Sequence, residues 1–121
     1  MGVVLIVEDE EQVRVLVHSA IQEARHQTLT AANVEEAVAL LRNEQQPIDL
    51  LFTDIRLWHD AQGGITLAHH AVDLRPGIRV LYTTGVGVTD GMRALFVGGF
   101  LFLGKPYKLD ALRAFVTEQL G

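Results

Sequence analysis

The chain has 121 residues, 49% of them hydrophobic, and a formal net charge of −5. This length suits one domain with one core, residues 1–121, and the hydrophobic share excludes a disordered chain. The absence of cysteine excludes a disulfide framework and thiol chemistry, and it fits a cytoplasmic location. An acidic chain without a long Lys/Arg run is unsuited to direct nucleic-acid binding. Its apolar runs are too short to span a membrane, so we expect no membrane contact.

Five short apolar runs predict strands. The run 3–7 is β-branched and is followed by an acidic loop. The run 27–31 is more polar, which predicts a strand at the edge of the sheet. The remaining runs predict buried strands. The expected strands are 3–7, 27–31, 48–54, 78–83 and 100–103.

Apolar residues at helical spacing predict a helix after each strand. Asn33 with Glu36 three residues later forms a capping-box start, and this second helix must stop before Pro47. The fourth helix is the weakest, because each interior glycine costs about 1 kcal/mol. The expected helices are 11–25, a segment from 33 that ends before 47, 65–74, 88–97 and 109–120.

The strict alternation of strands and helices predicts an α/β fold. We expect a doubly wound, flavodoxin-like, five-stranded parallel sheet of order 2-1-3-4-5, flanked by five helices. The carboxyl ends of parallel strands share one edge, where such folds bind ligands. Polar residues follow four of the strands at this edge. They are Glu8 and Asp9 after the first strand, Asp54 at the end of the third, Thr84 after the fourth and Lys105 after the fifth.

These five side chains can form one chemical site. Two carboxylates ~4 Å apart repel by about 4 kcal/mol at an effective dielectric of about 20, so a proton or a cation must lie among the three acids. Hard oxygen ligands suit Mg²⁺. Lys105 adds a positive charge and Thr84 adds a hydroxyl donor, which together with a metal suit the oxygens of a phosphoryl group. A carboxylate such as Asp54 can also be a nucleophile that forms an aspartyl phosphate.

Four short motifs of the chain resemble those of a known protein family. They are Val4-Leu5-Ile6-Val7-Glu8-Asp9, Phe52-Thr53-Asp54, Thr83-Thr84-Gly85 and Phe102-Leu103-Gly104-Lys105-Pro106. In this order and at these strand ends, they resemble the receiver (phosphoacceptor) domain of two-component response regulators over essentially the whole chain. Three further features are most similar to receivers fused to hybrid sensor histidine kinases. They are the segment Asp54-Ile55-Arg56-Leu57, the later Gly63 and the segment Gly104-Lys105-Pro106-Tyr107.

The resemblance implies a phosphorelay function. Asp54 accepts a phosphoryl group from a phosphohistidine in a Mg²⁺-dependent reaction. Asp9 and Asp54 coordinate Mg²⁺ directly, together with the backbone carbonyl of Arg56, and Glu8 acts through water. The domain is not a turnover enzyme, since it catalyses only its own phosphorylation and slow dephosphorylation.

The resemblance also implies a switch and partners. Lys105 pairs with the phosphoryl oxygens, and its bond to Pro106 is expected to be a cis peptide. Thr84 moves toward the phosphoryl group, and the rotamer of Phe102 follows it. The surface of the fourth helix, fifth strand and fifth helix then changes, and it can serve as a homodimer interface. The partner is a histidine kinase or a histidine phosphotransfer protein, and the chain is either a whole small protein or one domain of a longer one.

Several alternatives compete with this interpretation. Thr83 is an adjacent hydroxyl, although strand phasing favours Thr84. A phosphatase with an aspartyl-phosphate intermediate usually has a second Asp where this chain has Arg56. A flavin-binding module needs a hydroxyl-rich phosphate loop, but the acidic loop 8–11 repels phosphate. A degenerate receiver that only docks or dimerises stays open, because Trp58 replaces the proline usual four residues after the acceptor.

Overall fold

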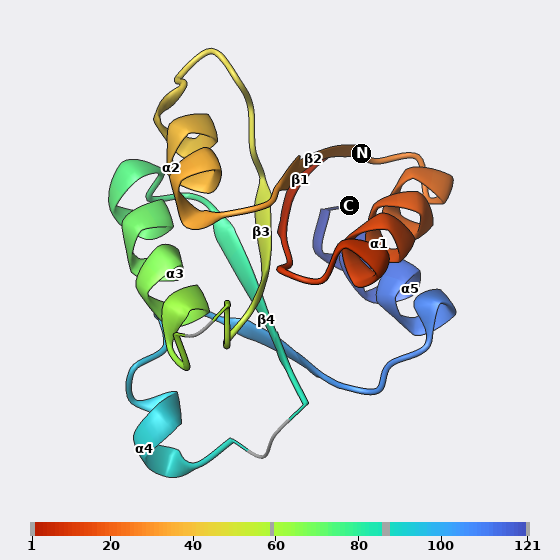
Figure 1. Cartoon of the computed structure of the whole chain (residues 1–121). Helices are drawn as coiled ribbons and strands as arrows, with labels where there is room; N and C mark the ends of the chain where they lie inside the picture. Colours follow the sequence, from red (N-terminus) through yellow and green to blue (C-terminus); the bar gives the residue numbers. More distant parts are fainter. Residues whose placement is uncertain (1, 59, 86–87, 121) are drawn as a thin grey trace.

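Five parallel strands form one sheet with the order β2-β1-β3-β4-β5 in the computed structural model, which describes residues 2–58, 60–85 and 88–120 (Figure 1). The strands are β1 (Val3–Val7), β2 (Gln27–Ala31), β3 (Leu50–Asp54), β4 (Arg79–Thr84) and β5 (Leu101–Gly104). The helices are α1 (Glu11–Glu23), α2 (Val34–Arg42), α3 (Gly63–Leu74), α4 (Asp90–Arg93) and α5 (Leu109–Leu120). The predicted fold class and strand order are confirmed.

The sheet separates two hydrophobic cores, because successive strand residues point to opposite faces. On one face, Leu5 and Leu51 pack with residues of α2 and α3, such as Leu41. On the other face, Val4 and Leu50 pack with residues of α1 and α5. Figure 1 shows α1 beside α5 on one side of the sheet and α2 beside α3 on the other. None of the described helices has the length and apolar character that a membrane crossing requires.

The register of the central strands sets the position of the site. Val7 of β1 lies opposite Thr53 of β3, so the residues that follow them, Glu8 and Asp54, come level at the same edge. Asp54 in turn lies opposite Thr83 of β4. Glu8 and Asp54 therefore meet because β1 and β3 are adjacent strands with this register, although the two acids are 46 positions apart in the sequence.

Two expected elements differ from the structure. The fourth helix, expected over 88–97, is only α4, because the backbone after it tightens into turns such as Leu95 N–H to Met92 O at 3.0 Å. These turns allow Val97 N–H to donate to the hydroxyl of Tyr82 at 3.2 Å. The expectation that the fifth strand is buried was wrong, since Leu101 and its neighbours on β5 are only half-buried at the outer edge of the sheet.

Strand and helix ends also shift by a few residues. β3 begins at Leu50 rather than 48, although Asp49 N–H still donates to Val3 O at 2.8 Å. α1 ends at Glu23 rather than 25, because Arg25 has the left-handed φ of 69° that ends a helix. The more polar β2 lies at an edge of the sheet, as predicted.

Candidate functional site

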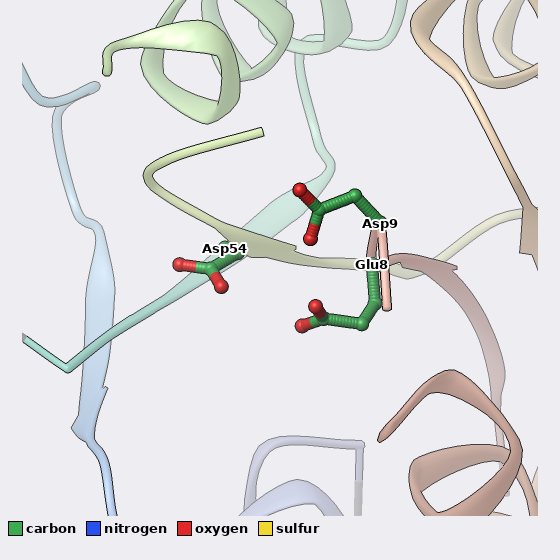
Figure 2. Close-up of side chains that lie close together, drawn as sticks. All are labelled: Glu8, Asp9 and Asp54. Atoms are coloured by element: carbon green, nitrogen blue, oxygen red, sulfur yellow. The ribbon is translucent and has the colours of Figure 1, made fainter. Parts of the chain in front are cut away.

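Three carboxylates meet at the carboxyl edge of the sheet. One oxygen from each of Glu8, Asp9 and Asp54 lies within 4.8 Å of the others. Figure 2 shows the carboxylates of Glu8 and Asp9 extending from the end of β1 toward Asp54 at the end of β3. Glu8 is 0% exposed and Asp54 is 8% exposed, whereas Asp9 is half-buried. We call these three residues the acidic cluster.

Lys105 supplies the positive charge of the site. Its Nζ lies 2.7 Å from Asp54 Oδ2 and 3.7 Å from Glu8 Oε2. Lys105 N–H donates to Thr84 O at 2.9 Å, which continues the pairing of β5 with β4 and aims the side chain at the acids. Burial alone would lower the pKa of Lys105, but the hydrogen bond to Asp54 and the charge of Glu8 outweigh it and raise this pKa. The bond to Pro106 is cis, as expected.

The environment of Glu8 disfavours the charged form of its carboxyl group. Burial raises the pKa of Glu8 to about 7, against the lowering effect of the Lys105 charge. Its Oε1 accepts from Glu10 N–H at 3.2 Å. Its Oε2 is buried and has no hydrogen-bond partner among the described residues. A buried carboxylate oxygen without a donor is a position that a cation or a metal-bound water would satisfy.

Thr84, Arg56 and Phe102 lie around the acidic cluster. Thr84 and Arg56 line a pocket of about 230 Å³ together with Asp9 and Asp54. Phe102 lines an adjoining pocket of about 410 Å³, which also includes Thr84 and is bounded by the lysine of the site. All the predicted site residues therefore lie at one edge of the sheet, with Phe102 one pocket away from the acids.

Thr83 and Thr84 occupy different environments. Both are buried, and Thr83 faces the core between the sheet, α1 and α5, on the side of its neighbour Leu81. The Thr83 hydroxyl has no hydrogen-bond partner among the described residues. Thr84 instead lines both pockets at the strand ends. Its position supports Thr84 as the hydroxyl of the site.

Two features of the site were missed in the sequence. Gly64, at the start of α3, packs so closely that a Cβ there would lie 1.8 Å from the carbonyl oxygen of Asp54. The resemblance to the family singled out Gly63 instead. Only the occurrence of two consecutive glycines, Gly63 and Gly64, before a helix could have indicated the contact of Gly64 with Asp54. The second feature is a hydrogen bond of 2.7 Å from the backbone N–H of Trp58 to Asp9 Oδ2. No sequence pattern marks a backbone donor of this kind.

Comparisons with known proteins agree with this geometry. Response regulator protein PilR of Pseudomonas aeruginosa is 37% identical over 117 residues, which are 96% of this chain and 25% of that protein. Sporulation initiation phosphotransferase F of Bacillus subtilis is 26% identical, over 97% of this chain and 92% of that protein. The crystal structure of the receiver domain of the hybrid histidine kinase CckA has a TM-score of 0.81 and 28% identity, and the match covers 99% of this chain and 100% of that one.

The extent of these matches defines what is shared. This chain spans about a quarter of the length of PilR and nearly all of the Bacillus phosphotransferase. The profile of the response regulator receiver domain matches residues 4–117, which include every predicted site residue. Receiver domains are phosphoacceptor signalling domains that interact with histidine kinases or phosphotransfer proteins. The chain belongs to the response regulator receiver domain family.

Proposed function

We propose that Asp54 accepts a phosphoryl group from the phosphohistidine of a histidine kinase or phosphotransfer protein. The observation that carries this proposal is the position of the Lys105 ammonium, 2.7 Å from Asp54 Oδ2 in a pocket shared with two further acids. Asp54 is only 8% exposed, and the Lys105 ammonium contacts its carboxylate directly. The same cation is placed to pair with the oxygens of an incoming phosphoryl group.

The acidic cluster fits Mg²⁺. Its three carboxylates offer oxygens within 4.8 Å of one another, and the buried Oε2 of Glu8 has no donor among the described residues. Asp9 and Asp54 would hold the ion directly, Arg56 through its backbone carbonyl, and Glu8 through a water. When bound, Mg²⁺ would neutralise charge on the transferred phosphoryl group.

The protein's own residues orient the reactants. Asp54 lies at the rigid end of the central strand β3, so its carboxylate is held for in-line attack on the phosphorus atom. Lys105 would exchange part of its contact with Asp54 for a phosphoryl oxygen. Thr84, which lines the same pocket as Asp54, would then donate a hydrogen bond from its hydroxyl to another phosphoryl oxygen. These roles require positioning and charge rather than a general base.

Phosphorylation would change the surface of α4, β5 and α5. Movement of Thr84 toward the phosphoryl group would empty part of the pocket that Phe102 lines, and the Phe102 ring would turn into it. Because α4 is short and β5 is only half-buried, few side chains hold this region in place. We propose this surface as the output and homodimer interface of a cytoplasmic module, either alone or within a hybrid sensor kinase.

The competing proposal of a degenerate receiver is weaker. Such a domain loses residues of the phosphoacceptor site, whereas Glu8, Asp9, Asp54, Thr84 and Lys105 are all present and close together. The aspartyl-phosphate phosphatase is also disfavoured, since no second acid follows the proposed nucleophile at two residues.

Phosphorylation by a small phosphodonor tests the proposed function. The chain is incubated with phosphoramidate or acetyl phosphate, with Mg²⁺ or with EDTA, and its intact mass is measured. We expect one added phosphoryl group with Mg²⁺ and almost none with EDTA. The Asp54→Asn variant should remain unmodified, and equal modification of this variant would refute the role of Asp54.

A further inference from the structure

The loop between β3 and α3 forms a tight turn beside the acidic cluster. Leu57 N–H donates to Asp60 O at 3.1 Å and Asp60 N–H donates to Leu57 O at 2.9 Å, so these two residues form an antiparallel bridge. Trp58 is the first residue of this turn and has a φ of 55°, in the left-handed region. In this conformation its backbone N–H donates to Asp9 Oδ2 at 2.7 Å.

We propose that Trp58 is a positioning residue whose backbone N–H holds the Asp9 carboxylate in the acidic cluster, ready for a cation. This proposal rests on the proposed Mg²⁺-dependent function of that cluster. The hydrogen bond joins a backbone donor to a charged acceptor, which is the stronger kind of hydrogen bond in proteins. It links the β3–α3 turn directly to the end of β1.

The hydrogen bond from Trp58 N–H opposes the repulsion within the acidic cluster. Glu8 and Asp54 are buried and cannot move away from each other, whereas Asp9 is half-exposed and could rotate into solvent. The like charge of Asp54 repels the Asp9 carboxylate, so an untethered Asp9 would turn outward. The Trp58 N–H opposes this rotation and leaves a preformed set of ligands, which reduces the ordering that cation binding requires.

The residue at position 58 must therefore supply both a donor and a left-handed φ. Proline, the usual residue at this place in the family that the chain resembles, has no N–H and fixes φ near −65°. It could make neither the turn nor the hydrogen bond seen here. The half-buried Trp58 side chain also packs against the core on the α2 and α3 face of the sheet, and it lines a pocket of about 580 Å³ with Asn33 and Val34. This packing holds a side chain in a conformation that glycine would adopt without strain.

A pair of variants separates the backbone donor from the indole ring. Trp58→Gly keeps the N–H and the left-handed φ but removes the ring, and Trp58→Pro removes the N–H. Mg²⁺ affinity of the 121-residue chain is measured by isothermal titration calorimetry. We expect Trp58→Gly to bind as the wild type does and Trp58→Pro to bind about tenfold more weakly. Wild-type affinity in Trp58→Pro, or an equal loss in both variants, would overturn the proposal.

A second measurement covers the case in which Trp58→Pro does not fold. In the ¹⁵N-labelled, metal-free wild type, we expect the Trp58 amide proton at unusually low field, because it donates to a carboxylate. Asp9→Ala should move this resonance upfield, because it removes the acceptor. No response to Asp9→Ala would overturn the proposal. If the wild type itself binds no Mg²⁺, the proposed function fails as well, and this result is distinct from a failure confined to Trp58→Pro.

Discussion

Glu8 offers the sharpest test of the electrostatics of the site. Its carboxyl group is 0% exposed, and burial raises its pKa from 4.5 to about 7. Each pKa unit corresponds to 1.36 kcal/mol, so without a metal the ionised form of Glu8 costs the folded state about 3 kcal/mol. Glu8→Gln removes the titration but keeps the size of the side chain.

The direction of the pH effect follows from the raised pKa. Below about pH 4.5, Glu8 is protonated in both states and its contribution to stability is fully present. Between about pH 4.5 and 7 the unfolded chain releases the proton while the folded chain keeps it, so stability is lost as the pH rises. In EDTA, the wild type should therefore lose about 3 kcal/mol relative to Glu8→Gln between about pH 4.5 and 8.

Urea unfolding followed by far-ultraviolet circular dichroism measures this difference at each pH. Adding Mg²⁺ at the alkaline end should stabilise the wild type more than Glu8→Gln, because the ion compensates the charge of the buried carboxylate. A stability difference between the two proteins that stays constant from acid to alkaline pH would refute the reasoning. So would equal stabilisation of both by Mg²⁺.

Four further predictions concern Gly64, the two threonines and Trp58. Gly64→Ala should destabilise the fold by more than about 3 kcal/mol in urea unfolding, because its Cβ would lie 1.8 Å from a backbone oxygen. As a control, Gly77→Ala should change stability by less than about 0.5 kcal/mol, because no atom lies within 4 Å of its Cβ. Equal effects of the two variants would contradict the close approach of Gly64 to β3. Thr83→Val should stabilise the chain by about 1 kcal/mol, since it removes a buried hydroxyl without a partner among the described residues, and leave phosphorylation by acetyl phosphate unchanged. Thr84→Val should slow that phosphorylation by about tenfold or more, and the opposite result would exchange the roles of the two threonines. Trp58, the one tryptophan of the chain, should change its fluorescence during a Mg²⁺ titration, and an unchanged emission while calorimetry detects binding would contradict its link to the site.

Most of the fold and the members of the site could be predicted because both follow from the order of elements. Alternating strands and helices impose a parallel sheet, and a parallel sheet places the residues after each strand at one edge. Glu8, Asp54 and Lys105 needed only the identity of the strands to be brought together. The structure adds the distances, such as 2.7 Å between Lys105 Nζ and Asp54 Oδ2.

The features that could not be predicted depend on backbone conformation and tertiary contacts. The Trp58 N–H reaches Asp9 only because the turn adopts a left-handed φ of 55°, which no side-chain pattern marks. The contact of Gly64 with β3 depends on how closely α3 approaches the sheet. α4 is shorter than its apolar spacing indicates, because the backbone after it tightens into turns that place Val97 N–H against the Tyr82 hydroxyl. Local spacing carries no information on these long-range partners.

The central claim, that Asp54 is the phosphoacceptor, is tested most directly by chemical trapping. An aspartyl phosphate is reduced by borohydride to homoserine, which marks the modified position permanently. The chain is phosphorylated with acetyl phosphate and Mg²⁺, reduced, digested and sequenced by tandem mass spectrometry. We predict homoserine at position 54 and at no other acidic residue. A phosphorylated chain without homoserine at position 54 would contradict the account. So would homoserine at Asp9, or 5-hydroxynorvaline, the product that reduction of a glutamyl phosphate leaves, at Glu8.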